Sequence, residues 1–562
     1  MPFRGSRWSV AGVLVGLFAG RAARATAPTA DERAALVVVA DRHAPKGAVV
    51  RDRAWNAQTV SHLAAWARGD AGAASAAEIA LLNEELSRPL ALSVSGAVSL
   101  GNYQGGFLYY LLAAFGELRA LDKLAAARAG ATWKASESLS PLGLVTGASS
   151  GSINAFVAAI AACQELEASP RKSLFWNVWV PVGGKELTSS EEVSPDGLLS
   201  IKPIRKAAET IQTAWRQGKW RKEPCVVDVG LLATRLRARQ IRPLDGVNLA
   251  LPLQNEKLVF TMSVDGSGVP MLAPLEPPAD DPRAGLLHEL LRRPPRYDVE
   301  TITEALRASS AFSFAFPPRW LNLVADDTGH HDDGWFTDGG VFDDRPVGLA
   351  VELRTWRLAR EHKDPKTHTH YIIQDPDVTV PSVIADVEPA LAGPPPRKTF
   401  IDTWMSFAGD FINTAFELEL LDALEREPTL VEDIEIPPRQ GPVAGAYLLE
   451  FLAFAENDFR VFDFYTGMVD AWQHLAETSL AFQVIRGMDD GPTFVDAPEL
   501  ACLTAYRTRQ LAGIAGGVPA ACEAVGANLT PPDPTLRRNV KALAHASAVT
   551  KAWRDRQPPA LS

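Results

Sequence analysis

A serine stands between two glycines in the segment Gly147-Ala148-Ser149-Ser150-Gly151, which is a G-x-S-x-G pattern. A short apolar run over residues 142–145 precedes it and a helical apolar pattern over residues 153–166 follows, so the segment is predicted to be a strand-to-helix turn. Such a turn projects the serine hydroxyl from the edge of a sheet and directs the positive end of the helix toward a developing oxyanion. The flanking glycines suit this tight turn because larger side chains would collide there. We therefore predict that Ser149 is the nucleophile of an acyl-ester hydrolase.

A nucleophilic serine needs a base, and none of the ten histidines of the sequence lies in an obvious catalytic turn. His330-His331-Asp332-Asp333 is typical of a polar loop, and His368 and His370 alternate at the start of a predicted strand. Metal binding by these histidines is the alternative interpretation, but their spacing alone does not bring the two groups together, so a solvated loop and strand edge is favoured. The stronger candidate for the base is Asp338 in Phe336-Thr337-Asp338-Gly339-Gly340, because the two glycines permit close backbone approach around a carboxylate. By itself this segment would be interpreted as an ordinary Asp-Gly turn.

Five segments occur in a fixed order along the chain and together resemble the patatin-like phospholipase family. They are the glycine-rich stretch from Ser95 to Gly106, the Ser149 turn continued by Ser152-Ile153-Asn154-Ala155, Ala308-Ser309-Ser310-Ala311-Phe312 running on to Phe316-Pro317-Pro318, Asp338-Gly339-Gly340, and Val341-Phe342-Asp343-Asp344-Arg345-Pro346. The resemblance covers residues 90–380, approximately half of the chain. An ordered set of segments is far more specific than any one of them.

The resemblance implies an α/β fold with a mostly parallel central sheet covered by helices. It also implies a Ser-Asp dyad, in which Ser149 attacks the ester carbonyl and Asp338 is the general base. The acid motif would then include Gly339 and Gly340. Backbone N–H groups would form the oxyanion hole, and in this sequence they belong to Gly96, Ala97 and Val98. The implied reaction is hydrolysis of a phospholipid or another acyl lipid, of the phospholipase A or lysophospholipase type, through an acyl-enzyme and without a cofactor or metal.

The oxyanion loop and the segment after Asp338 depart from the family pattern. Its oxyanion loop commonly reads glycine-glycine-glycine-x-arginine-glycine, whereas residues 96–101 contain Ala97, Val98 and Leu100. Alanine and valine resist the positive φ angles that glycine adopts, and the loss of the arginine favours neutral or lysolipid esters over anionic phospholipids. Asp344 stands where asparagine is more common, and it would raise the pKa of Asp338 if the two side chains are close.

The altered loop keeps a second hypothesis open, which is a catalytically weak patatin-like protein that binds lipid or a partner. A third hypothesis is a hydrolase with an ordinary Ser-His-Asp triad. It requires a histidine beside Ser149.

The elements that must position these residues follow from hydrophobic periodicity. Strand, glycine turn and helix occur twice, over residues 90–121 and 142–166, which is the pattern of a parallel sheet covered by helices. Further predicted strands lie at 225–229, 257–264 and 370–373, and predicted helices after the Pro-rich break at 393–396 lie at 400–424, 447–454, 468–482 and 498–514.

The aromatic stripe of 400–424 indicates packing against the catalytic domain or, alternatively, docking on a membrane. Phe459 to Met468 resembles a helical extension of some bacterial patatin-like proteins. The predicted division is a leader at 1–27, an N-terminal helical segment at 28–89, a catalytic domain at 90–385 and a helical C-terminal region at 397–562.

The N-terminus has the order of a secretory signal peptide. Arg4 and Arg7 are followed by a nearly uncharged apolar run from Trp8 to Gly20 and by the A-x-A pattern Ala23-Arg24-Ala25. The apolar run is shorter than the roughly 20 residues that span a bilayer. We therefore expect export, to the periplasm, the outer membrane or the medium, with a frayed N-terminal helix as the alternative.

The composition is that of an ordinary globular protein, with 47% hydrophobic and 22% charged residues in 562. A net charge of -11 argues against a nucleic-acid partner but not against transient contact with a membrane surface. The four cysteines are Cys163, Cys225, Cys502 and Cys522. They are too few for a disulfide scaffold, and either a Cys502–Cys522 loop or four free thiols is expected. No C-x-x-C pair indicates a structural zinc site.

Overall fold

The computed structural model of this chain describes residues 57–130, 142–378, 433–445 and 452–488, apart from short gaps inside the last three ranges. Several predictions from the sequence therefore lie outside the described residues: the leader at 1–27, the Pro-rich break at 393–396, the helices at 400–424 and 498–514, and the pair Cys502 and Cys522. None of the described helices is both long and apolar enough to cross a membrane.

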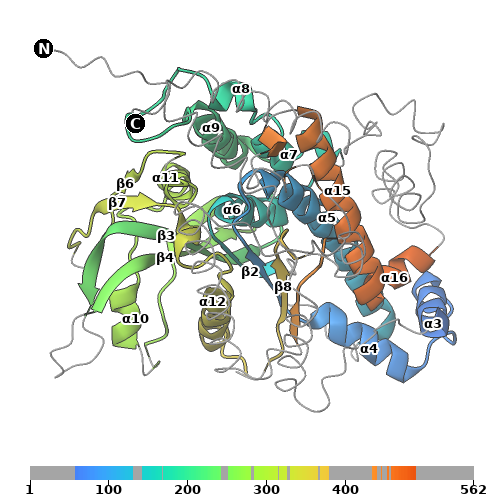
Figure 1. Cartoon of the computed structure of the whole chain (residues 1–562). Coiled ribbons are helices and arrows are strands. Elements are labelled where there is room, and N and C mark those ends of the chain that lie inside the picture. Colours follow the sequence, from blue (N-terminus) through green and yellow to red (C-terminus); the bar gives the residue numbers. More distant parts are fainter. Residues whose placement is uncertain are drawn as a thin grey trace, which may run out of the picture.

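One mixed sheet forms the centre of the described structure (Figure 1). Its strands are β1 (Leu90–Val94), β2 (Leu142–Gly147), β3 (Cys225–Ile241), β4 (Leu251–Val264), β5 (Pro270–Pro274), β6 (Arg319–Leu321), β7 (Gly334–Thr337), β8 (His370–Gln374) and β9 (Ile434–Glu435). The order is β5-β4-β3-β2-β1-β8-β9, and β7 pairs with both β3 and β6. The pairings from β3 through β2, β1 and β8 to β9 are parallel, whereas β4, β5, β6 and β7 pair antiparallel. The predicted fold class, a mostly parallel sheet covered by helices, is confirmed.

Helices cover both faces of the parallel strands, and every residue of β1 and β2 is buried as a result. Alternate residues serve the two faces, because side chains of a strand point in opposite directions with a period of two. Leu92 and Val94 belong to the core shared with α5 (Gly101–Ala129) and α6 (Ser150–Cys163). Ala91 and Leu144 belong to the core shared with α12 (Val347–Arg360) on the opposite face (Figure 1).

The other described helices surround this core. They are α3 (Ala57–Arg68), α4 (Ala76–Ser87), α7 (Leu174–Trp179), α8 (Gly184–Leu187), α9 (Lys202–Gln217), α10 (Ala284–Leu290), α11 (Val299–Ser309), α15 (Asn457–Thr478) and α16 (Leu480–Gly487), with 3-10 turns η1 (Val98–Leu100), η3 (Pro170–Lys172), η4 (Gly339–Val341) and η6 (Leu452–Phe454). The sequence indicated helix over residues 30–90, and α3 and α4 occupy its described part. It did not indicate α7 to α12.

The helix α15 packs closely on α5, although more than 300 residues separate them (Figure 1). Two glycines allow the approach: a Cβ on Gly106 would overlap the carbonyl of Phe464, and one on Gly467 would overlap the carbonyl of Tyr103. The Tyr103 hydroxyl donates a buried hydrogen bond to Asp470 Oδ2 at 2.9 Å. The segment that resembles a helical extension therefore supports the helix that follows the predicted oxyanion loop.

A disulfide joins the end of α6 to the start of β3, through Cys163 and Cys225. The expectation of four free thiols is wrong for these two residues. The two cysteines are 62 positions apart in the sequence. Sequence spacing gave no sign of this pair because the sheet, and not a local loop, brings the two residues together. Parallel pairing of β2 with β3 places the beginning of β3 beside the helix that leaves β2.

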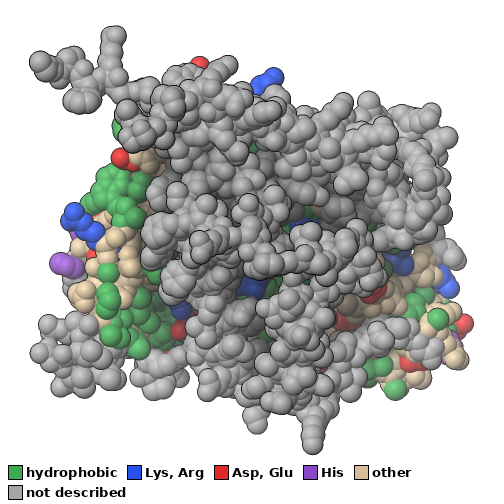
Figure 2. Space-filling model, viewed as in Figure 1, with side chains coloured by type: hydrophobic (Ala, Val, Ile, Leu, Met, Phe, Trp, Pro, Cys, Tyr) green, Lys and Arg blue, Asp and Glu red, His purple; other side chains and the backbone are tan. Residues whose placement is uncertain are grey.

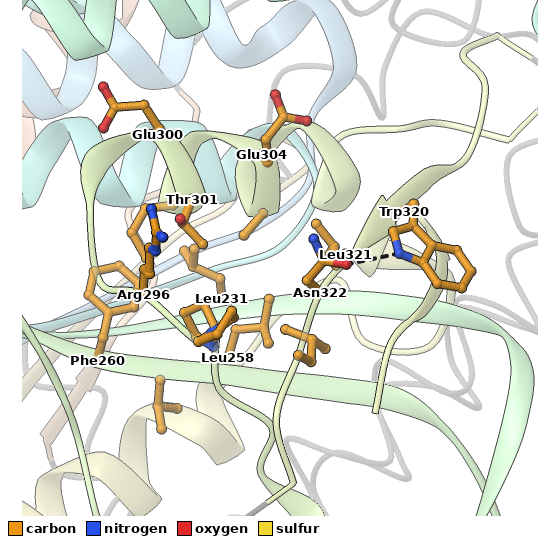
Figure 3. Close-up of a pocket in the computed structure, with 16 residues that line it drawn as sticks. Leu231, Leu258, Phe260, Arg296, Glu300, Thr301, Glu304, Trp320, Leu321 and Asn322 are labelled. Carbon is orange, nitrogen blue, oxygen red and sulfur yellow. Dashed lines mark hydrogen bonds between the residues drawn. The ribbon is translucent and has the colours of Figure 1, made fainter. Parts of the chain in front are cut away.

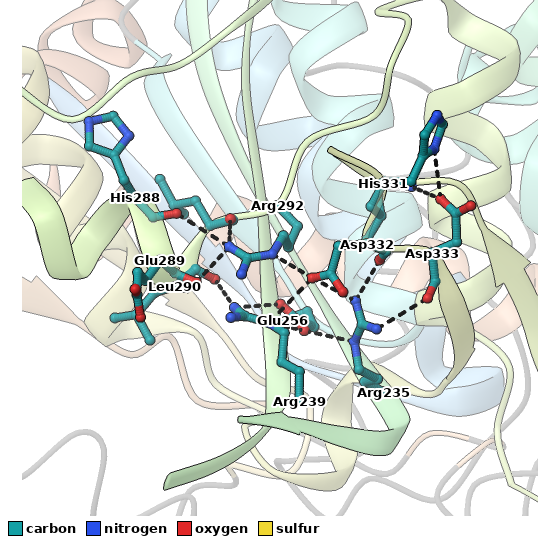
Figure 4. A network of polar contacts seen from close by, with 12 residues as sticks. Arg235, Arg239, Glu256, His288, Glu289, Leu290, Arg292, His331, Asp332 and Asp333 are labelled. Atoms are coloured by element: carbon teal, nitrogen blue, oxygen red, sulfur yellow. Dashed lines mark hydrogen bonds and ion pairs between the residues drawn. The ribbon is translucent and has the colours of Figure 1, made fainter. Parts of the chain in front are cut away.

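A buried network of arginines holds the long β3–β4 hairpin against the segment that precedes β7 (Figure 4). Glu256 of β4 is fully buried and accepts hydrogen bonds from Arg235 at 2.9 Å and from Arg239 at 2.8 Å. Asp332 pairs with Arg235 and also with Arg292, whose Nε lies 2.5 Å from its carboxylate. The loop is solvated at His330 and His331, as expected, but Asp332 is only partly exposed and is held by arginines. Each of the two carboxylates has at least two arginine partners, and Glu256 in particular would be strongly unfavourable without them because it is fully buried.

Hydrophobic side chains are also exposed at the edge of the sheet where β3, β4, β6 and β7 lie, as Figure 2 shows. Trp320 of β6 and Trp335 of β7 are paired across the strands, with ring centroids 5.5 Å apart in an edge-to-face arrangement. Both rings are about half exposed. Exposed tryptophans are common where a protein meets a second apolar surface.

Candidate active site

The turn at Ser149 connects β2 to α6, as the sequence predicts. Ser149 has φ 52° and ψ -129°, a backbone conformation that non-glycine residues rarely adopt. The flanking glycines are required by contact: a Cβ on Gly147 would lie 2.5 Å from the carbonyl oxygen of Gly151, and one on Gly151 would overlap the carbonyls of Val94 and Ser95. The strained turn thus holds the serine at the carboxyl end of the parallel strands, with α6 beginning at the next residue.

Asp338 follows β7 directly and is held from both sides. Its N–H donates to the Ala311 carbonyl at 3.1 Å, and its Oδ1 accepts from the Gly340 N–H at 2.9 Å. A Cβ on Gly339 would overlap the carbonyl of Leu232 in β3. The two glycines therefore allow the turn to lie against β3 while it aims the carboxylate at its partner.

That partner is Ser149, whose Oγ donates to Asp338 Oδ2 at 2.7 Å. Both side chains are buried, with exposed fractions of 8% for Ser149 and 4% for Asp338. Burial raises the pKa of Asp338 from its ordinary 3.8 to about 6, although the hydrogen bonds from Ser149 and the Gly340 N–H favour the ionised form. A carboxylate with this pKa is ionised at neutral pH and is still a better proton acceptor than an exposed aspartate.

No described histidine forms a hydrogen bond or ion pair with Ser149 or Asp338. The histidines with an acidic partner use it elsewhere: His62 pairs with Glu78, His288 with Glu276, His331 with Asp333, His368 with Asp433, and His370 and His474 with Glu435. Within the described residues, no three or more His, Cys, Asp or Glu side chains are grouped as metal ligands. Among the described residues, no histidine therefore lies in position to act as the base that the Ser-His-Asp hypothesis requires.

The predicted oxyanion loop lies beside Ser149, but its N–H groups are not equivalent. The Gly96 N–H is bonded to Asp344, through both its carbonyl at 3.2 Å and its Oδ1 at 3.1 Å. The Ala97 N–H donates to Ser150 Oγ at 2.8 Å. No described residue accepts a hydrogen bond from the Val98 N–H. Of the three predicted donors, only that of Val98 is therefore available without a rearrangement.

Val98 has φ 43°, which is the left-handed region that a β-branched residue adopts only at a cost of roughly 1–3 kcal/mol. Ala97, with φ -156° and ψ 10°, stays outside the left-handed region. The neighbouring Leu100 is fully buried in a small apolar cluster with Ala97, Tyr103 and Val443. Leu100 thus turns into the protein and helps hold the strained loop.

Asp344 is pressed between two glycines of the site. A Cβ on Gly96 would overlap its Oδ1, and one on Gly340 would lie 2.5 Å from the same atom. Burial raises the pKa of Asp344 well above its ordinary range, and the charges of Asp375, Asp338 and Asp377 raise it further, against the effect of Arg345. Asp338 thus raises the pKa of Asp344, but the reverse effect that the sequence led us to expect is not seen, because Asp344 is not among the groups that shift the pKa of Asp338. Burial is the largest cause of the raised pKa of Asp338.

A buried polar chain that the sequence did not single out supports the loop from below. Gln104 of α5 donates to the Ser95 carbonyl at 2.8 Å, and Asn154 of α6 donates to Gln104 Oε1 at 3.0 Å. The indole N–H of Trp179 completes the chain by donating to Asn154 Oδ1 at 2.7 Å. An asparagine within the otherwise apolar second and third turns of α6 was the available signal, since a buried amide must find partners.

Two serines at the C-terminal end of α11 contact the nucleophile turn, and the sequence indicated them only as part of a resemblance. Ser309 Oγ lies 2.7 Å from Ser152 Oγ, and Ser310 Oγ donates to the Ser149 carbonyl at 3.0 Å. These contacts fix α11 to the turn. Such a pairing between distant segments has no local sequence signal.

A small apolar cavity opens onto Ser149. Its volume is about 60 Å³, and its walls include Val98, Ile153, Trp179, Phe312 and Phe454. The cavity is narrow compared with the roughly 150 Å³ of an engineered protein cavity that binds benzene. It offers an apolar environment beside the hydroxyl and fits the first carbons of an acyl chain.

Residues 92–351 match the family model described as patatin-like phospholipase. The matched range contains the oxyanion loop, the serine turn and Asp338. No curated protein matches the chain significantly in sequence.

Proposed function

Residues 92–351 form a domain of the patatin-like phospholipase family, and on that premise we propose that this protein hydrolyses lipid acyl esters with Ser149 as nucleophile and Asp338 as general base. The observation that carries the proposal is the 2.7 Å hydrogen bond from Ser149 Oγ to Asp338 Oδ2 in a buried site. Among the described residues, Asp338 is the only acid that accepts a hydrogen bond from Ser149. The strained turn directs the serine hydroxyl toward this carboxylate.

The reaction follows from this geometry in two halves. Asp338 accepts the hydroxyl proton while Ser149 Oγ forms a bond to the ester carbonyl carbon. When the tetrahedral intermediate collapses, Asp338 returns the proton to the departing alcohol and an acyl-enzyme remains. A water then attacks the acyl carbon, gives its proton to Asp338, and releases the fatty acid as the Ser149 oxygen regains that proton. The bonds and protons in these steps balance without a cofactor.

The developing negative charge would be stabilised by the Val98 N–H and by the N-terminal end of α6. The free Val98 N–H is the first donor, and the strained φ of this residue directs it differently from its neighbours. The Gly96 N–H would join it if the Asp344 carboxyl moves aside when substrate binds. Each such donor contributes about 2.7–4 kcal/mol to transition-state stabilisation in related hydrolytic chemistry.

An acyl lipid is the proposed substrate class because the cavity beside Ser149 is apolar and opens beside an aromatic side chain. Phe312 lines the cavity and is nevertheless 39% exposed. An exposed aromatic ring at the mouth suits transient contact with a lipid surface, from which the substrate would enter. The loss of a cationic side chain at Leu100 favours neutral or lysolipid esters.

Export from the cytoplasm is the proposed location. The order of charges, apolar run and A-x-A pattern at the N-terminus motivates it, and the Cys163–Cys225 disulfide is of the kind that persists in oxidising compartments. Fractionation of cells that express the full chain tests this. Protein found in the cytoplasm with its N-terminal methionine retained would contradict it.

The test of activity compares the wild type with Ser149→Ala and Asp338→Ala on short-chain nitrophenyl esters, which the narrow cavity accommodates. We expect hydrolysis by the wild type and near-background rates for both variants. A covalent fluorophosphonate label should appear on Ser149 in the wild type and disappear in Ser149→Ala. Equal rates for all three proteins would refute the proposal.

The second candidate function is a lipid-binding protein with weak catalysis. It is favoured by the internal bonds that occupy the Gly96 and Ala97 N–H groups. If the wild type binds lipid vesicles but turns over no ester and takes no fluorophosphonate, this second function is the correct one.

A further inference from the structure

A second and larger cavity lies outside the Ser149 site, between α11 and the strands β3, β4 and β6 (Figure 3). Its volume is about 340 Å³, which falls within the range of roughly 300–1,000 Å³ typical of small-molecule sites. None of its lining residues lines the cavity at Ser149, and neither Ser149 nor Asp338 reaches it. It is therefore a separate site.

The floor of this cavity is built from apolar side chains. Leu231 of β3 and Phe260 of β4 come from the sheet, Ile302 and Ala305 come from α11, and Leu321 closes β6. These residues belong to the buried core, yet they leave open space among them. Such a wall binds the hydrocarbon part of a ligand and rejects a fully polar one.

The described residues that line the cavity include three charged side chains, which are Arg296, Glu300 and Glu304. Glu300 pairs with Arg216, and Glu304 pairs with Arg307 and Arg319, so both rim carboxylates are neutralised by arginines. Arg296 is exposed, lines the cavity, and forms no hydrogen bond or ion pair with any described residue. Asp298 is near enough for Arg296 to affect its pKa, but its carboxylate already accepts two hydrogen bonds from Thr301.

Figure 3 shows Arg296 at one end of the lining residues and Trp320 at the other, with apolar side chains between them. The arrangement combines a planar guanidinium, an apolar channel and an aromatic end. A guanidinium binds a carboxylate through two parallel hydrogen bonds, which a point charge cannot do.

We propose that this cavity binds a single-chain amphiphile with a carboxylate head, namely a free fatty acid. The chain lies on the apolar floor and the carboxylate pairs with Arg296. The choice of a fatty acid over other anionic amphiphiles rests on the proposed function, since ester hydrolysis at Ser149 releases one.

The position of α11 explains how such a product would find the cavity. One face of this helix lines the second cavity, and Ser310, directly after its end, donates a hydrogen bond to the Ser149 carbonyl and lines the first cavity. The helix therefore lines the second cavity, and the residue that follows its C-terminal end lines the first. A fatty acid that leaves Ser149 has an apolar site one helix length away along the chain.

The experiment locates the ligand directly, using full-length protein and dodecanoic acid that carries a diazirine. After illumination, crosslinked peptides are mapped by mass spectrometry, and affinity is measured by competition with unlabelled dodecanoic acid, dodecanol and dodecyltrimethylammonium. We expect crosslinks in residues 294–305 and 320–323, which contain lining residues of the second cavity but none of the Ser149 cavity, and competition in the order acid, alcohol, ammonium. The Ser149→Ala variant should give the same crosslinks, because this site does not use the nucleophile.

Two variants test the assigned parts of the cavity. Arg296→Ala should weaken binding of dodecanoic acid roughly 2- to 5-fold, the range for a pair at an exposed rim, and should leave dodecanol unaffected. Ala305→Leu fills the floor and should weaken both ligands more than roughly 10-fold, by removing the space that the chain needs. Arg237→Ala, an exposed arginine elsewhere on β3, is the matched control and should change nothing.

Asn322→Trp, which plugs the rim, replaces Ala305→Leu if the latter does not fold. Crosslinks confined to the Ser149 cavity, or identical affinities in Arg296→Ala, Ala305→Leu and the control, would overturn the proposal. The outcome is independent of catalysis: an inactive wild type that still crosslinks at α11 would contradict the proposed function and retain the binding site.

Discussion

Replacing Asp338 by asparagine should remove activity and, at neutral pH, remove a source of instability. The side chain is buried and its oxygens accept hydrogen bonds from Ser149 and Gly340. An amide of the same shape cannot take the serine proton, so kcat/KM should fall roughly 10²- to 10⁴-fold, the usual contribution of a general base. The fold should survive, because the substitution adds no volume.

The effect on stability follows from the pKa of Asp338, which burial raises from 3.8 to about 6. The folded protein therefore holds this proton more tightly than the unfolded chain. The associated stabilisation is complete below about pH 4 and is lost as the pH rises through about 6. Between these limits the free energy of unfolding of the wild type should fall by about 3 kcal/mol because of this group. Each unit of difference between the pKa values of the folded and unfolded states corresponds to 1.36 kcal/mol.

Asparagine does not titrate, so Asp338→Asn should lack this loss. Its amide can satisfy only one of the two donors, which costs roughly 1–3 kcal/mol at every pH. The free energy of unfolding should therefore be measured for both proteins from pH 4 to pH 8. As the pH rises, the variant should become more stable relative to the wild type. Urea denaturation at several pH values gives this free energy, and ester hydrolysis over the same range should show a wild-type rate that rises through about pH 6. A stability difference that does not depend on pH, or a variant with near wild-type activity, would refute the assignment of Asp338 as a buried base.

Three further perturbations test the remaining features of the site. Asp344→Asn keeps an oxygen for the Gly96 N–H but cannot ionise. Because the pKa of Asp344 is raised well above 3.8, its charge develops at a higher pH than that of an ordinary aspartate, and the wild-type rate should fall where this charge develops while the variant rate should not. Persistence of that fall in the variant would count against Asp344 as its cause. Gly96→Ala places a methyl group on the Asp344 carboxyl and should lower kcat by roughly 10²-fold or more, whereas Gly266→Ala, in open space, should be neutral; equal kinetics for the two would contradict the crowding. Removing the disulfide with Cys163→Ser and Cys225→Ser should destabilise the fold by about 4 kcal/mol relative to oxidised wild type, given the sequence separation of 62, as measured by urea denaturation. Unchanged midpoints would show that the bond is absent in solution.

Local features of the sequence determined much of the catalytic frame. The apolar run, glycine turn and helical pattern around Ser149 predicted β2, the turn and α6, since each depends on neighbouring residues alone. The strands at 90–94, 225–229, 257–264 and 370–373 were indicated in the same way, although β3 and β4 extend well beyond the predicted bounds. The glycines after Asp338 marked a close backbone approach without showing what is approached. The family resemblance, not the spacing, joined that aspartate to the serine.

Only the tertiary structure decided which distant residues meet. Ser149 and Asp338 are 189 positions apart and are brought together because β7 pairs with β3, which pairs with β2. The same sheet order joins Cys163 to Cys225, a pairing that sequence spacing did not suggest. Asp344 illustrates the limit most clearly. Its identity was visible in the sequence, but the burial that raises its pKa and presses it against Gly96 comes from packing, and packing depends on contacts that no single segment specifies.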